Sequence, residues 1–160
     1  MNSHGYVLAV DQLLAATLLA PFVGAFLCGL TRGRAREFIA VLTSALTVAL
    51  SMLLVFGLGG LQDPPTYPST DSSFLYISAD SLSALLTARA AGVALLVIIY
   101  AGQYESLGEA LQESAGVPVE QNAGGQGWLL LGVGGALGVF LAGNLPTLLI
   151  FLIVLSFATW

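Results

Sequence analysis

Long apolar runs separated by short polar stretches are the main pattern of this chain. Each run is continuously hydrophobic, which is typical of helices that cross a membrane and differs from the alternation of a half-buried strand. We therefore predict five transmembrane helices with a linker and an acidic loop between them. The helices are expected at about residues 13–30, 38–58, 79–101, 128–142 and 145–160, the linker at 59–77 and the loop at 105–127.

The composition agrees with a membrane-embedded chain. Of the 160 residues, 57% are hydrophobic and 8% are charged, whereas about 25% of the residues of soluble domains are charged. Backbone groups in lipid must form their hydrogen bonds within the segment, so unbroken apolar runs indicate helices. We expect one all-α integral membrane domain that passes through the cell membrane several times. The net charge of −5 argues against nucleic acid as a partner.

The basic residues predict an orientation. Arg32, Arg34 and Arg36 lie in the short turn between the first two runs and make up three of the four basic residues. Loops rich in arginine and lysine stay on the cytoplasmic side of a membrane. We therefore expect the N-terminus and the linker 59–77 outside, and the acidic loop 105–127 inside.

Hydroxyl and glycine residues indicate faces that pack against protein. Four serine and threonine residues between 43 and 51 give the second run a mildly polar side, which suits burial against another helix. Gly134 and Gly138 in the fourth run have the spacing of small residues that lets two helix backbones approach closely.

The fifth run is short for a membrane crossing. Asn144 or Leu145 can cap its helix, with Pro146 in the first turn. The residues from there to Trp160 cover about 24 Å, against a hydrocarbon core of about 30 Å. We expect this chain to correspond to the first part of a larger protein, or to be completed by neighbouring chains.

Two charged residues, Asp80 and Arg89, are candidates for an ion path. Asp80 stands at the start of the third run, where an acid also caps a helix and opposes its dipole favourably. Arg89 lies near mid-depth in the same run, where an arginine costs about 2.5 to 3.5 kcal/mol on an insertion scale. Lipid offers this side chain no partner, so we expect protein or water beside it. Two roles stay open for Arg89, a structural ion pair between subunits and a step in a proton or cation path.

Motifs of known catalytic and metal sites are missing from the sequence. It contains no HExxH, CxxC, Walker or GxSxG motif and only one histidine, His4. The single cysteine, Cys28, sits in an apolar run and is interpreted as a small core residue. We therefore predict no catalytic residue, no metal and no cofactor, and we do not expect an enzyme.

Three short segments carry a resemblance to a known family. They are LLAPFVGAFL at 18–27, ADSLSALL at 79–86 with Tyr100 and Tyr104 downstream, and LAGNLPTLLIF at 141–151. In order and spacing they resemble the N-terminal part of the large antiporter-like subunits. Such subunits occur in Mrp-type multisubunit cation/proton antiporters, in respiratory complex I and in membrane-bound hydrogenases. The resemblance slightly favours the large subunit of an Mrp antiporter over the other members.

The resemblance implies a subunit of a Na⁺/proton antiporter that works with other membrane subunits in a lipid bilayer. The family's fifth helix carries a Trp-Glu pair in the ion path, but Leu152 and Ile153 occupy these positions here. The expected contribution is therefore assembly, with translocation carried mainly by partner chains. Two alternatives stay open: a membrane-arm subunit of a redox complex, such as a quinone-reducing dehydrogenase or hydrogenase, and a purely structural membrane subunit.

Overall fold

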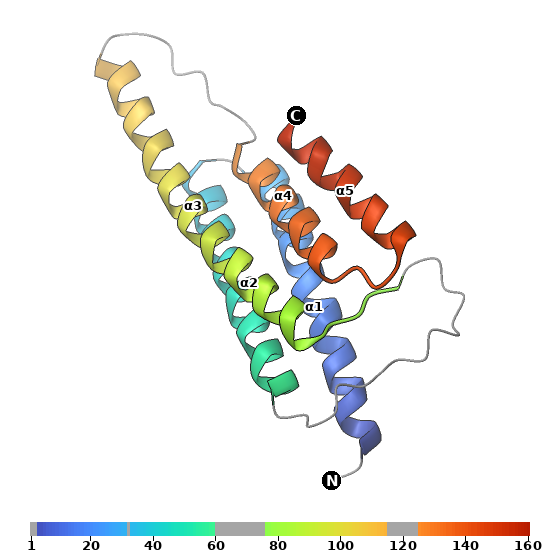
Figure 1. The fold of residues 1–160 in the computed structure, drawn as a ribbon. Coiled ribbons are helices and arrows are strands. Elements are labelled where there is room, and N and C mark those ends of the chain that lie inside the picture. Colours follow the sequence, from blue (N-terminus) through green and yellow to red (C-terminus); the bar gives the residue numbers. More distant parts are fainter. Residues whose placement is uncertain (1–2, 32, 60–75, 115–124) are drawn as a thin grey trace.

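The chain folds as a bundle of helices in the computed structural model, which describes residues 3–31, 33–59, 76–114 and 125–160. No strand occurs among these residues, so the all-helical prediction is confirmed. The helices are α1 (Ser3–Leu30), α2 (Arg34–Gly59), α3 (Ser81–Ser114), α4 (Gly125–Phe140) and α5 (Leu145–Thr159) (Figure 1).

The helix bounds differ from the predicted ones mainly at two polar ends. α1 begins at Ser3 instead of residue 13, and α3 continues to Ser114 through the first part of the predicted acidic loop. Residues 101–114 contain no proline and are rich in alanine, leucine, glutamate and glutamine, which favour helix. The apolar run ends near residue 101, but nothing in the local sequence stops the helix there.

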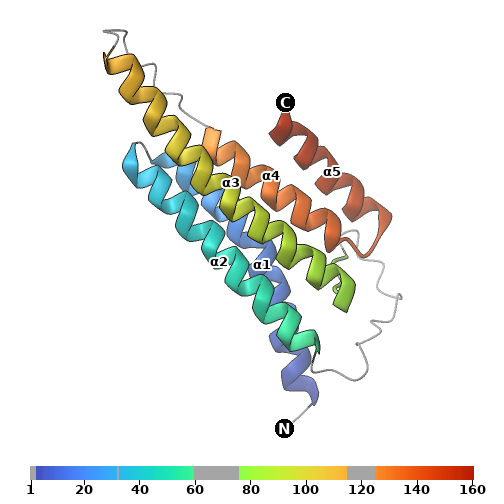
Figure 2. The same cartoon turned by 60° about the vertical axis from the view of Figure 1, so that its left-hand side comes forward.

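The helices form two layers with α5 at one edge. α1 and α2 pack against each other, α3 packs on α2 and α4, and α4 packs on α1. α5 lies against α4, on the side away from α2 (Figures 1 and 2). We call the end of the bundle with the α1–α2 turn the arginine end, and the end where α3 begins the aspartate end.

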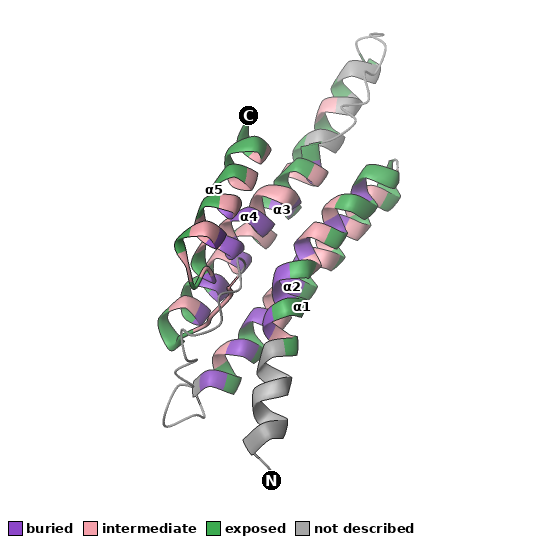
Figure 3. Ribbon diagram, turned by 90° about the vertical axis from the view of Figure 1, so that its right-hand side faces the viewer, coloured by how far each residue is buried: buried purple, intermediate pink, exposed green. Residues whose placement is uncertain are grey.

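The bundle has an apolar exterior and a partly polar interior. Exposed positions recur along every helix (Figure 3). Large apolar side chains such as Phe26, Phe38 and Phe56 are among the exposed ones. Hydroxyl side chains are buried instead, and Ser44, Thr47, Ser51, Thr87 and Thr147 are among them. A protein surrounded by water would reverse this distribution. The pattern therefore suits a surrounding that is as apolar as lipid.

Three of the described helices are long and apolar enough to cross a membrane. The qualifying segments are Gln12–Leu30, Arg34–Leu58 and Ser81–Tyr104, and between 28% and 33% of each is buried inside the protomer. α4 and α5 are apolar as well, but shorter. Most of the surface of each long segment is therefore left for lipid or for partner chains. The orientation of the N-terminus stays a prediction.

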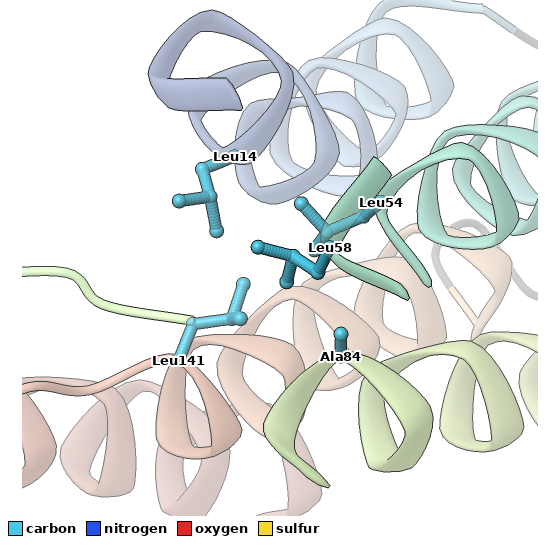
Figure 4. Packing of buried hydrophobic residues seen from close by; sticks show 5 residues of the cluster. All are labelled: Leu14, Leu54, Leu58, Ala84 and Leu141. Carbon is cyan, nitrogen blue, oxygen red and sulfur yellow. The ribbon is translucent and has the colours of Figure 1, made fainter. Parts of the chain in front are cut away.

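Two apolar clusters hold the four-helix part of the bundle together. At the aspartate end, side chains from α1, α2, α3 and the turn after α4 point toward one another; they are Leu14, Leu54, Leu58, Ala84 and Leu141 (Figure 4). Nearer the arginine end, the second cluster contains Cys28, Ala40, Ile98 and Leu130. Cys28 is 2% exposed, which confirms it as a core residue.

A short bridge fixes the start of α3 against the turn between α4 and α5. Ile77 pairs with Ala142 in an isolated antiparallel bridge, and the Ser78 N–H donates to the Leu141 carbonyl at 3.0 Å. Asn144 caps α5 by accepting a hydrogen bond from the Thr147 N–H at 3.0 Å. Of the two caps that the sequence left open, Asn144 and Leu145, the structure therefore has Asn144.

The glycines of α4 face two different neighbours. A Cβ on Gly134 would lie 2.9 Å from the Phe22 ring of α1. A Cβ on Gly138 would clash with the Phe151 ring of α5. A Cβ on Gly135 would lie 2.9 Å from the backbone nitrogen of Leu155. The close backbone approach is thus between α4 and α5 at Gly135, a residue that the small-residue spacing of Gly134 and Gly138 did not identify.

We predict that Gly135→Ala destabilises the bundle while Gly132→Ala does not. The new methyl at 135 meets backbone, which cannot rotate away, so we expect a loss of about 1 to 3 kcal/mol. At 132 the nearest atom is the Ala158 Cβ at 3.6 Å, an ordinary contact. Thermal unfolding of the two variants in detergent measures the difference. Equal unfolding temperatures would contradict the close α4–α5 approach.

Candidate functional site

Asp80 lies at the aspartate end and caps α3. Its carboxylate accepts a hydrogen bond from the Ser83 N–H at 2.7 Å, and its own N–H donates to Ser83 Oγ at 2.9 Å. These reciprocal bonds satisfy amide groups that the first turn of a helix leaves open. The bonds from Ser83 lower the pKa of the Asp80 carboxyl below its ordinary value. Asp80 is exposed, so it has the geometry of a cap with access to the surroundings.

Arg89 lies well inside the third segment of membrane-spanning length. At 1.5 Å per residue it is about 12 Å along the helix from Ser81, the first residue of the segment. Its side chain is exposed on the surface of α3. Within the described ranges, no hydrogen bond or ion pair involves Arg89. The structure does not bring Asp80 and Arg89 together, because Asp80 is held by Ser83 at the helix start.

A groove between α3, α4 and α5 contains Arg89. Its volume is about 810 Å³, and Arg89 is the only charged residue among those that line it. α3 contributes Arg89 and Val93 to one wall, and α5 contributes Leu155 and Ala158 to the other. Small residues of α4 lie between them, and Gly132 is one. The groove is therefore a mainly apolar depression along the bundle surface, with one charged side chain, that of Arg89, in its wall. We call it the α3/α5 groove.

A layer of hydroxyl groups crosses the interior of the bundle. Thr17, Ser51 and Thr87 are each completely buried. Each lies three residues from a member of the apolar cluster at the aspartate end, namely Leu14, Leu54 and Ala84, and therefore on the same helix face one turn further in. Each hydroxyl donates to a carbonyl of its own helix at 2.7 or 2.8 Å. Small hydroxyl residues of this kind let membrane helices pack closely.

The arginine end holds a second group of polar side chains. Gln126 of α4 is buried, and a Cβ on Gly102 of α3 would lie 3.4 Å from its side-chain nitrogen and 3.6 Å from a carboxylate oxygen of Glu37. The Arg36 carbonyl accepts a hydrogen bond from Cys28 Sγ at 3.6 Å. Arg34 is exposed. These contacts close the bundle at the end where the sequence predicts the cytoplasm.

Two parts of the sequence predictions lie outside the described residues. These are Arg32 and the loop regions at residues 60–75, most of the predicted linker, and 115–124, part of the predicted acidic loop. No group of His, Cys, Asp or Glu residues that could hold a metal occurs in the described part of the chain. The α3/α5 groove was not found from sequence, because it depends on α5 standing against α4 and leaving the surface of α3 open. The only signal in the sequence was the uncompensated charge of Arg89.

Comparison with family models, with curated proteins and with solved structures gives no match to this chain. The resemblance of three segments to antiporter-like subunits therefore stays a prediction. The class that the fold itself supports is coarser: an all-helical protein with three helices of membrane-spanning length and composition.

We predict that Asp80→Ala destabilises the start of α3 by about 1 kcal/mol, the usual cost of losing a helix cap. Because the folded-state pKa of Asp80 is lowered, its contribution is present above the unfolded pKa of about 3.9 and is lost as the pH falls through the folded value. Thermal unfolding in detergent between pH 7 and pH 3 measures both effects.

Asp80→Asn is the matched control for the Asp80→Ala variant. An asparagine oxygen can accept the same hydrogen bond from the Ser83 N–H but does not titrate. We expect this variant to keep most of the stability at neutral pH and to lose less of it in acid than the parent. An Asp80→Ala variant as stable as the parent at pH 7 would show that the cap is dispensable.

Proposed function

We propose that this chain is a subunit of a multisubunit Na⁺/proton antiporter in the cell membrane, and that its role is assembly of the membrane part. One observation carries the assembly role: Arg89 is exposed within a membrane-length helix, and no described residue pairs with it. The three sequence segments that resemble antiporter-like subunits support the choice of an antiporter over other complexes.

The energetics of Arg89 favour an assembled state. An arginine at the centre of a lipid-facing helix costs several kcal/mol, and such residues in membrane proteins are usually paired or placed at a water-filled cavity. The apolar residues of α3 can offset the insertion cost, but they do not solvate the guanidinium. A partner chain that supplies a polar group would remove the penalty. The groove position of Arg89 leaves room for such a chain.

The charge distribution supports an assembly role over translocation by this chain alone. α4 and α5 contain no Asp, Glu, Lys or Arg, and Arg89 is the only charged residue of the long segment in α3. Leu152 and Ile153, which stand where the family has its Trp-Glu pair, are exposed apolar residues of α5. An ion path needs ionisable or polar groups in series across the membrane. Partner chains would supply them.

Deletion of the gene in its host tests the proposed function. We expect loss of growth at high sodium and high pH, and loss of Na⁺-driven proton exchange in inverted membrane vesicles. The protein extracted in a mild detergent should purify with other small membrane subunits. Restoring the intact gene is the control.

Two results would contradict the antiporter proposal. Normal exchange and normal sodium tolerance without the gene would remove the transport role. Co-purification with subunits that carry flavin, iron–sulfur clusters or quinone would instead assign the chain to a redox complex, the alternative left open by its sequence. In either case Arg89 would have its assembly role in a complex other than a Na⁺/proton antiporter.

A further inference from the structure

We propose that the α3/α5 groove receives a membrane-crossing helix of a partner subunit, and that this helix places an Asp or Glu carboxylate beside Arg89. The inference rests on the proposed assembly role and names the surface and the chemistry of the partner. The shape of the groove, the depth of Arg89 along α3 and the positions of the acidic residues in this chain each support it.

The shape of the groove suits one helix. It runs from Trp128 at one end of α4 to Phe140 at the other, a length of about 18 Å at 1.5 Å per residue. Half of a helix about 10 Å wide and 18 Å long would occupy roughly 700 Å³, and the groove measures about 810 Å³. Ala90 on α3 and Gly132 and Ala136 on α4 line it. Small residues of this kind allow close approach between membrane helices.

The depth of Arg89 favours a carboxylate on a helix over a lipid phosphate. The Cα of Arg89 lies about 12 Å along α3 from Ser81, which is further than an extended arginine side chain reaches. Arginines near the ends of membrane helices can extend to the lipid headgroups, but those near the middle pair with protein groups or water. Because Arg89 is the one charged residue among those that line a mainly apolar groove, the complementary group is an acid carried on the helix that fills it. A guanidinium forms its strongest hydrogen bonds with a carboxylate, often two in parallel.

A second copy of this chain does not supply that acid. The long segment Gln12–Leu30 contains no Asp or Glu, and the only Asp or Glu of Arg34–Leu58 is Glu37, near the arginine end. α3 has no acidic residue between Ser81 and Tyr104, and α4 and α5 have none at all. Every acidic residue in or next to these helices therefore lies close to one or the other end of the bundle, away from its middle. The partner must be a different chain with an acid near the middle of its membrane helix.

Site-specific photo-crosslinking in host membranes tests the occupant of the groove. The photoreactive residue p-benzoylphenylalanine replaces Val93, which lines the groove, or Leu96, which does not. The two positions are matched, because both lie on α3 and their side chains are 62% and 68% exposed. We expect at least ten times more protein adduct from position 93. The crosslinked peptide should come from another chain, in an apolar segment with an Asp or Glu within one helical turn.

A charge exchange then tests the ion pair itself. Arg89→Glu should release the crosslinked partner and reduce the adduct from position 93 at least ten-fold, because two carboxylates would face each other. Changing the partner's acid to Arg should restore the adduct in the Arg89→Glu background and not with the parent chain. Arg89→Lys, which keeps the charge, should retain most of the adduct. Because Arg89 is exposed in the protomer, circular dichroism of each variant should show unchanged helix content.

Several results would overturn the inference. They are adducts with lipid alone, adducts with a second copy of this chain, equal yields at positions 93 and 96, and a charge exchange that restores nothing. The failure of the antiporter proposal looks different. If the adduct identifies a subunit of a quinone reductase, the groove and the ion pair stand while the antiporter does not. If an antiporter subunit crosslinks only at position 96, the antiporter stands and the groove is not its docking site.

Discussion

The apolar surface of the helices is the feature on which this account depends, because it indicates a surrounding without water. Every backbone group in an apolar surrounding must find its partner inside the segment, and the three segments of membrane-spanning length are helical throughout. The same constraint places the hydroxyls of Thr17, Ser51 and Thr87 inside, where each bonds to its own helix. It also allows side chains such as Phe56 to remain on the surface.

Arg89 departs from that arrangement, and its exposed position is the basis of the proposed assembly role. A bundle that turns its hydroxyl groups inward leaves the charge of Arg89 on the outside, in the wall of a groove. The groove exists because α5 stands on α4 at the glycine contact of Gly135 and leaves the adjoining surface of α3 open. Gly132 of α4 and Arg89 of α3 both line this groove, in which we propose that a further helix docks.

Much of the fold could be predicted from the sequence, because helices of this kind appear in a sequence as long apolar runs. The helical class, a cap at Asn144 or Leu145 and the burial of Cys28 followed from local pattern alone. The start of α1 at Ser3 did not, since hydrophobicity stops where the apolar run stops and the helix does not. The groove could not be predicted either. It depends on which face α4 turns toward α5, and the spacing of Gly134 and Gly138 does not reveal that Gly135 makes the close contact.

Solid-state NMR of the assembled complex in lipid, with labelled arginine and labelled carboxyl carbons, tests the central claim most directly. The chain has four arginines, and the Arg89→Lys variant assigns the signal of Arg89. An ion pair predicts dipolar coupling between its guanidinium nitrogen and a carboxyl carbon of another chain, at an N···O separation of about 2.7 to 2.9 Å. A guanidinium that couples only to lipid phosphorus, or that exchanges freely with water and shows no carboxyl neighbour, would contradict it.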